Sequence, residues 1–207
     1  MTAGEGLGRL LNGRPGVWLV RWQNQVTDPF DVLPLYLGTV GEQDDYGQFW
    51  HIELMHYDLP PDARFDLGTF VTHPVDADLA GQVRLLGMRH TAGPRVVLLW
   101  QAAAAMGTDY TVFAHLVNAD GEVLVTADHR PTRPTSQWPV HHIVPDQVTL
   151  TLPADLPGGD DYWLAVGMYD AADPAMPRLG PVTSDSGEGH PGDQVMIPFV
   201  VKDTSLE

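Results

Sequence analysis

The sequence predicts a mainly β protein, in which an antiparallel β-sandwich of jelly-roll or immunoglobulin-like type follows a small α/β segment. Two observations lead to this fold class. Short runs of apolar and β-branched residues recur along most of the chain, with turn-forming residues between them. The 207 residues also include 18 prolines and 21 glycines, which favour frequent turns over long helices.

Residues 1–62 are expected to form the α/β segment. Its predicted elements are a helix at 5–12, a strand at 17–22, a helix at 31–37 and a strand at 49–59. The first strand reads VWLVRW, a continuous apolar run typical of a strand that is covered on both faces. Asp31 is a candidate N-cap for the second helix, and Gly38 is a candidate for its end. The strand–helix–strand order predicts that the two strands lie side by side.

Residues 63–207 are expected to form the β-sandwich. The predicted strands lie at 83–90, 95–101, 110–117, 122–127, 148–152, 162–170 and 195–201. The turn NADG at 118–121 favours a hairpin. Alternation in the strand at 162–170 places Leu164, Val166 and Met168 on one face, and Trp163 and Tyr169 on the other. Pro198 predicts an edge position or a bulge for the last strand.

Composition excludes several classes of function. The 11 basic and 27 acidic residues give a net charge of 11 − 27 = −16, which disfavours nucleic acids and anionic lipid surfaces as partners. The absence of cysteine excludes disulfides and thiolate zinc sites. No apolar run is long enough to span a membrane, and the start MTAGEGLGRL lacks the apolar core of a signal peptide. The final Leu206–Glu207 pair resembles residues that a cloning vector adds, so an excised segment of a longer protein is expected.

Several phrases carry a resemblance to a known class of protein. They are WQA at 100–102, DYTVFAHL at 109–116, NADG at 118–121, PTSQW at 134–138 and GMYD at 167–170. In this order they resemble the C-terminal, extracytoplasmic β-sandwich of multi-spanning bacterial membrane glycosyltransferases of the dolichyl-phosphate-mannose–protein mannosyltransferase-like class. The stretch from VWLVRWQNQVTDP to HIELMHYDLPP resembles the α/β segment that follows the last membrane span in these proteins. The likeness covers most of the chain.

This resemblance implies a non-catalytic accessory domain. The donor-binding acidic residues of such transferases lie in loops near their N-terminus, which this chain would lack. The implied partner is the membrane-embedded remainder of the parent protein, on the extracytoplasmic face of the cell membrane, and a glycan or an acceptor protein is a further implied partner. After the tryptophan the family pattern continues with a Pro-Gly-Glu turn. Residues 139–146 read PVHHIVPD instead, so no role for that turn is carried over.

Aromatic side chains are the main candidates for ligand binding, because sugar rings stack on flat aromatic faces. The candidate ligand-binding residues, with polar neighbours for sugar hydroxyl groups, are Trp138, Trp163, Tyr169, Gln137, Asp128 and Asp170. The alternative is structural: Trp100 lies in the core, Trp163 packs under a neighbouring layer, and Trp138 holds its own loop in place. A stand-alone carbohydrate-binding module remains a second reading of the same residues.

A metal-dependent hydrolase is a further alternative. His129, His141 and His142, with Asp128 and Asp146, include the ligand types that zinc prefers. Adjacent histidines on a strand point to opposite faces, however, so His141 and His142 do not easily reach one ion. The alternative is that these histidines are exposed loop residues and that the chain has no catalytic residue. His115, within an apolar strand, is expected to be a hydrogen-bonded interior residue.

The acidic, glycine-containing stretch TSDSGEGHPGD at 183–193 is a candidate structural calcium site. Asp185, Glu188 and Asp193 would supply the hard oxygen ligands that calcium prefers. The spacing fits no EF-hand, and the alternative is a solvated acidic loop. No other cofactor is expected.

Overall fold

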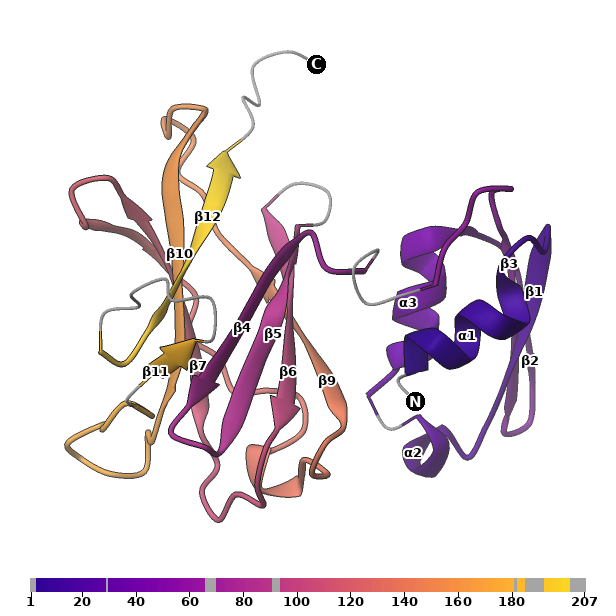
Figure 1. Ribbon diagram of the computed structural model, residues 1–207, viewed down its shortest axis with the longest axis horizontal. Coiled ribbons are helices and arrows are strands. Elements are labelled where there is room, and N and C mark those ends of the chain that lie inside the picture. Colours follow the sequence, from indigo (N-terminus) through magenta and orange to yellow (C-terminus); the bar gives the residue numbers. More distant parts are fainter. Residues whose placement is uncertain are drawn as a thin grey trace. The chain divides into compact units, whose positions relative to one another are not determined.

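The computed structural model describes residues 3–28, 30–65, 70–90, 94–180, 182–184 and 192–201. The chain divides into two compact units, Met1–Thr72 and His73–Glu207 (Figure 1). The sequence pattern placed the division after Asp62. Phe65 and Phe70 extend the first unit past that point, since their rings lie 5.9 and 5.0 Å from the ring of Tyr36 in the same unit.

The first unit is a three-stranded antiparallel sheet with helices. Its elements are α1 (Ala3–Leu11), β1 (Gly16–Trp22), α2 (Asn24–Thr27), α3 (Val32–Val40), β2 (Glu42–Phe49) and β3 (Ile52–Asp58). The strand order is β1-β3-β2, so the predicted neighbours β1 and β3 do lie side by side. Figure 1 shows α1 and α3 on the same side of this sheet. The fully buried Tyr57 of β3 is on the covered face, because Gly38 of α3 lies next to its ring.

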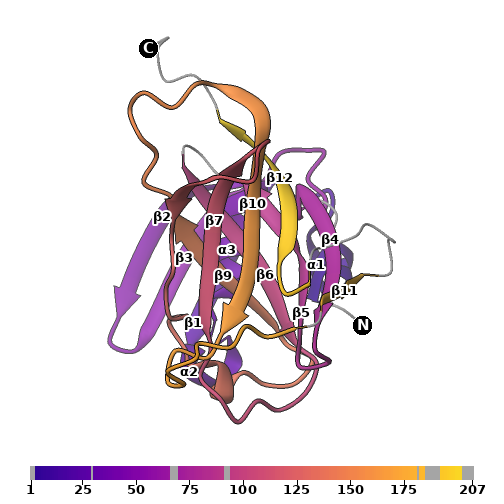
Figure 2. The same cartoon turned by 90° about the vertical axis from the view of Figure 1, so that its left-hand side faces the viewer.

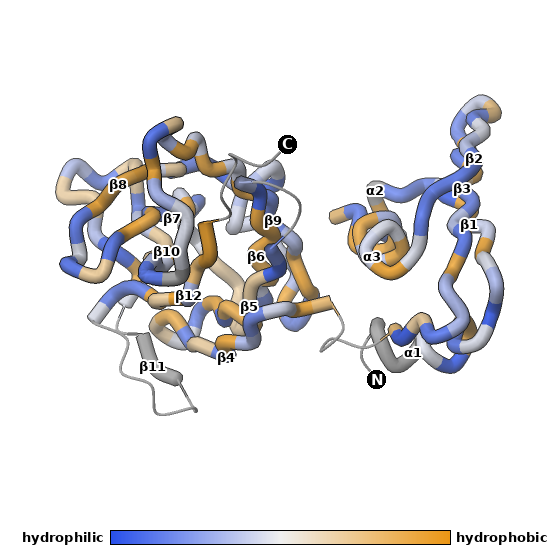
Figure 3. Tube along the Cα trace, turned by 90° about the horizontal axis from the view of Figure 1, so that it is seen from above, coloured by the Kyte–Doolittle hydropathy of each residue, from blue (hydrophilic) through white to orange (hydrophobic). Residues whose placement is uncertain are grey.

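The predicted strand at 49–59 is in fact one arm of a hairpin. β2 and β3 pair in antiparallel fashion around a turn at Trp50 and His51, and Trp50 has a positive φ of 55°. β2 reads EQDDYGQF and is exposed along almost its whole length, so it lacks the hydrophobic alternation that identifies a strand. Figure 3 shows the contrast between the mostly apolar α3 and the mostly hydrophilic β2.

The start of α3 differs from the prediction that Asp31 caps it. Asp31 makes no side-chain capping bond, has a φ of 52°, and forms an ion pair with Arg21. The cap is Asp28, whose two carboxylate oxygens accept hydrogen bonds from the backbone amides of Val32 and Leu33, both at 2.9 Å. The capping carboxylate thus comes from Asp28, three residues before the N-cap position at Asp31.

The end of α3 also lies beyond the predicted Gly38. The helix continues to Val40, and Gly41 donates its backbone amide to the Leu37 carbonyl at 2.8 Å. A Cβ atom at Gly41 would lie 2.4 Å from the Asp58 carbonyl oxygen of β3. Glycine is therefore required where the chain leaves the helix and enters β2, because the backbone passes too close to β3 for a side chain.

The second unit is an antiparallel β-sandwich, as predicted. One sheet has the order β11-β4-β5-β6-β9 and the other has the order β12-β10-β7-β8. The strands of the first are β4 (His73–Leu79), β5 (Val83–His90), β6 (Arg95–Ala102), β9 (Ile143–Thr149) and β11 (Val182–Ser184). Those of the second are β7 (Thr111–Asn118), β8 (Val123–Thr126), β10 (Gly159–Tyr169) and β12 (Val195–Val201). Figure 2 looks onto the four-stranded sheet, with β5, β6 and β9 behind it.

The core of the sandwich lies between the two sheets. Leu164, Val166 and Met168 of β10 are fully buried on the predicted face. Phe199 of β12 meets His90 of β5 with ring centroids 4.8 Å apart, which joins one sheet to the other. β12 is an edge strand, so the prediction from Pro198 is confirmed. No helix among the described residues is long and apolar enough to cross a membrane.

Candidate functional site

The predicted ligand-binding Trp138 is a buried structural residue. It follows a 3₁₀ turn at Thr135–Gln137, its side chain is only 3% exposed, and its indole Nε1 donates to the Arg133 carbonyl at 2.9 Å. Thr135 fastens the same loop, because its hydroxyl accepts from the Tyr110 amide and donates to the Thr108 carbonyl, both at 2.8 Å. The ring therefore offers no open face to a sugar. Gln137, one residue earlier, is exposed.

Trp163 and Tyr169 lie on the outer face of the four-stranded sheet, as the alternation predicts, and both are half-buried. Trp163 pairs with Val117 and Tyr169 with Thr111. The two rings are six residues apart on one strand, or roughly 20 Å at the usual rise per residue. They do not share one binding site.

Two of the predicted residues, Asp128 and Tyr169, lie close together. His115 of β7, in the same sheet as Tyr169 of β10, contacts Asp128. Asp128 Oδ1 lies 2.7 Å from His115 Nε2, so the expected hydrogen bond of His115 is present. The imidazole is not interior as expected, because it lies on the outer face of the sheet and is partly exposed. Burial raises the pKa of the Tyr169 phenol, and the charge of the adjacent Asp128 raises this pKa further. Asp170 is occupied locally, since its carboxylate accepts from the Ala172 amide at 2.9 Å. The polar groups of Asp128, His115 and Asp170 thus already have hydrogen-bond partners within the protein.

The histidine group at 128–146 does not converge. Instead, His129 Nε2 lies 2.9 and 3.0 Å from the two oxygens of Asp146, and Trp100 Nε1 donates to the same carboxylate at 3.4 Å. Asp146 is 6% exposed and Trp100 is fully buried. His141 and His142 are exposed turn residues. Among the described residues, this segment brings no three metal-ligating side chains together.

The His129–Asp146 pair joins the two sheets of the sandwich. His129 follows β8, and its backbone bridges Val112 of β7 in the four-stranded sheet, whereas Asp146 belongs to β9 in the five-stranded sheet. Burial lowers the pKa of the His129 imidazole, but the hydrogen bond and charge of Asp146 outweigh burial and raise the pKa above its ordinary value. The protonated imidazole is therefore favoured in the folded state.

This pair predicts a pH dependence of stability. Because the folded-state pKa of His129 is raised, its stabilisation is fully present below the unfolded pKa of about 6.5 and is lost as pH rises through the folded pKa. The free energy of unfolding of the wild type minus that of His129→Gln is thus expected to shrink as pH rises above 6.5. Denaturant titrations of both proteins at several pH values measure this difference in the free energy of unfolding, with His142→Gln as the control variant. A difference that does not change with pH would contradict the assignment.

The predicted calcium site is only partly described. Asp185 and Glu188 lie outside the described residues. Asp193 forms an ion pair with Arg178 at 3.1 Å, and the Arg178 guanidinium also lies 4.4 Å from the centre of the Phe113 ring. The calcium hypothesis stays a prediction.

The surface with the most exposed aromatic side chains lies in the first unit. We call it the aromatic face: Trp18, Val20 and Trp22 of β1, Phe49 of β2 and Ile52 of β3. Their exposed fractions are 54%, 59%, 59%, 61% and 39%. The register places Trp22 and Phe49 on either side of Ile52 in one row across the sheet. Exposed apolar side chains gathered on one face of a sheet are typical of interaction sites.

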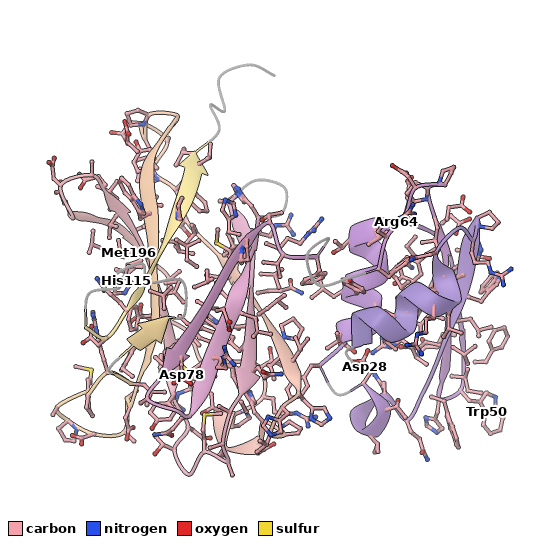
Figure 4. The ribbon with its side chains drawn as sticks, viewed as in Figure 1. Asp28, Trp50, Arg64, Asp78, His115 and Met196 are labelled. Carbon is pink, nitrogen blue, oxygen red and sulfur yellow. The ribbon has the colours of Figure 1, made fainter. Side chains whose placement is uncertain are left out.

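The aromatic face has an acidic end. Along the sheet from Trp22, the next rows contain Val20 with Leu54, then Trp18 with His56, and finally Asp58 with Glu42. Trp18 contacts the imidazole of His56 with ring centroids 4.7 Å apart. Trp50, at the β2–β3 turn, is 95% exposed and points away from α1 and α3 (Figure 4). One surface thus combines flat rings with carboxylates.

This surface is not evident from the sequence, because the continuous apolar run VWLVRW predicts a strand covered on both faces. In the structure, Val17 and Leu19 are half-buried, whereas Trp18, Val20 and Trp22 face solvent. The nine-residue helices α1 and α3 both lie on one side of the sheet (Figure 1), so the apolar side chains on its other side are exposed.

Comparison with protein-family models found no match, and a search of curated proteins found none either.

Proposed function

We propose that this chain is a non-catalytic accessory domain of a bacterial membrane glycosyltransferase, that it works on the extracytoplasmic side, and that it binds glycan through the aromatic face. The observation that carries glycan binding is the exposure of Trp18, Trp22 and Phe49 on one face of a sheet. The link to a glycosyltransferase rests on the resemblance of the phrases from WQA to GMYD.

The chemistry of the aromatic face suits a neutral, polyhydroxylated ligand. Indole and phenyl rings provide flat apolar surfaces for the C–H faces of sugar rings, and carboxylates accept hydrogen bonds from hydroxyl groups. Trp18 and Trp22 are four residues apart on β1, or about 13 Å along the strand, so they can contact different units of one oligosaccharide. A net charge of −16 disfavours an anionic partner for the same surface.

The β-sandwich unit is proposed to be a scaffold. Its imidazole–carboxylate pairs, His129–Asp146 and His115–Asp128, satisfy each other at 2.7–3.0 Å. Asp146 is buried, and no cluster of three metal-ligating side chains lies among the described residues of this unit. The carboxylate of the His129–Asp146 pair is buried, and the more exposed His115–Asp128 pair lies on the outer face of the sheet with no further metal-ligating side chain beside it among the described residues.

Calorimetry against a panel of mannose-, galactose- and N-acetylglucosamine-containing oligosaccharides tests the proposal. The Trp18→Ala/Trp22→Ala double variant is expected to lose at least tenfold in affinity for any sugar that the wild type binds, because two stacking surfaces are removed. Its melting temperature should stay close to that of the wild type, since both rings are more than half exposed.

Trp163→Ala is the matched control, because it removes an indole from the outer face of the sandwich and should leave affinity unchanged. Equal affinity of the double variant and the wild type would place the site elsewhere. No binding across the whole panel would leave only the scaffold role.

A stand-alone carbohydrate-binding module would give the same calorimetry. The parent gene separates these two readings, because membrane spans directly upstream fit only the accessory domain.

A further inference from the structure

We infer that Asp44, His56 and Asp58, at the acidic end of the aromatic face, form a binding site for a divalent transition-metal ion such as zinc or manganese. Each residue offers one ligand atom, and these atoms all lie within 4.8 Å of one another. Among the described residues this is the one group of three or more such side chains that gather in this way. The inference is independent of glycan binding.

The backbone explains why these three side chains meet. His56 and Asp58 are two residues apart on β3, so both project from the same face of the sheet. Asp44 belongs to β2, where the register with β3 shifts between Gln43 and Asp45. This irregularity adds one residue to β2 and turns the Asp44 carboxylate toward β3, so that its Oδ1 lies 2.5 Å from His56 Nδ1.

The imidazole of His56 is held in one orientation. Trp18 packs against one side of the ring, and Gly16 lies below its other nitrogen: a Cβ atom at Gly16 would be 2.9 Å from Nε2. Nε2 therefore faces the backbone of β1, and Nδ1 faces the carboxylates. A ligand nitrogen that is fixed before the ion arrives loses little conformational freedom on binding.

The local charge also favours a cation. Glu42 is the cross-strand partner of Asp58, and Asp45 is the partner of His56, so further carboxylates border the cluster. The ion pairs of the described residues include none for Asp58. A divalent ion would offset part of this negative charge.

The ligand set and geometry indicate which ion fits. Imidazole nitrogen with carboxylate oxygen suits zinc or manganese, whereas calcium and magnesium prefer oxygen ligands alone. Two ligands at about 2.1 Å from one ion are about 3.0–3.4 Å apart in octahedral or tetrahedral sites. His56 Nδ1 and Asp44 Oδ1 would therefore separate by less than about 1 Å and exchange their hydrogen bond for the ion. Three protein ligands leave at least one coordination position for water.

Calorimetric titration of the full, tag-free chain with zinc chloride tests the inference. The wild type is expected to bind one ion in a saturable manner. His56→Gln and Asp58→Asn should each weaken binding at least tenfold. Glu42→Gln removes the same charge from the same row without removing a ligand, and it should change affinity less than threefold.

Absence of saturable zinc binding by the wild type would overturn the inference. So would an affinity that His56→Gln leaves unchanged, since the ion would then bind elsewhere in the chain. A second measurement on the wild type does not depend on the folding of variants. Added manganese should broaden the backbone amide NMR signals of residues 44 and 56–58 and leave those of 141–142 sharp, and the reverse pattern would also refute the site.

Discussion

Replacement of His129 by alanine is expected to lower the free energy of unfolding by about 3 kcal/mol, near the lower end of the range for breaking a buried ion pair. His129 supplies the donor that lies within 3.0 Å of both oxygens of Asp146. Without it, the only donor that the described residues leave to this carboxylate, which is 6% exposed, is the indole of Trp100 at 3.4 Å. Urea titration at pH 6, followed by tryptophan fluorescence, measures the change.

His142→Ala is the control for this loss. His142 is exposed and its ring nitrogen lies 3.2 Å from the carbonyl of Val140, so its replacement should cost less than about 0.5 kcal/mol. Replacement of Asp146 by asparagine should recover part of the stability of His129→Ala, because the buried charge is then removed together with its partner. Equal stability of His129→Ala and the wild type would show that the two sheets do not depend on this pair.

Replacement of Trp138 by alanine is expected to cost about 3–5 kcal/mol, the usual range for truncation of a buried tryptophan. The ring is 3% exposed and its Nε1 donates to the Arg133 carbonyl at 2.9 Å, so both packing and a hydrogen bond are lost. Glycan binding should not change under conditions where the variant is folded, because the ring presents no face to solvent. Thermal and urea unfolding measure the stability change.

Trp50→Ala provides the comparison for Trp138→Ala. Trp50 is 95% exposed, and its loss should leave the free energy of unfolding within about 0.5 kcal/mol of the wild type. If Trp138→Ala were as stable as Trp50→Ala, the loop at 134–138 would not be held by its tryptophan.

The sandwich strands were predictable where hydrophobic alternation is strong. The strands at 83–90 and 195–201 have the predicted bounds, and β10 buries Leu164, Val166 and Met168 on the expected side. β4 escaped prediction because HPVDADL has a proline as its second residue and contains two aspartates. β2 escaped for a similar reason: an exposed edge strand needs no apolar side, so its sequence carries no period of two.

The candidate sites were harder to predict than the strands. The sequence singles out aromatic residues in a proline-rich loop, but it does not say whether a loop tryptophan points outward or, like Trp138, inward. The cluster of Asp44, His56 and Asp58 depends on a register shift in β2, a strand that was not predicted. Its ligands are 12 and 2 residues apart in sequence, a spacing that matches no metal-binding motif. Only the pairing of β2 with β3 brings them together.

Binding of glycan to the exposed tryptophans of the first unit can be followed by NMR of the six tryptophan indole groups. Signals are assigned with single Trp→Phe variants and followed as oligosaccharide is added to the ¹⁵N-labelled chain. We expect the Trp18 and Trp22 signals to shift in a saturable manner, whereas those of the buried Trp100 and Trp138 stay fixed. Saturable shifts confined to Trp163, or indole signals that none of the oligosaccharides moves, would contradict it.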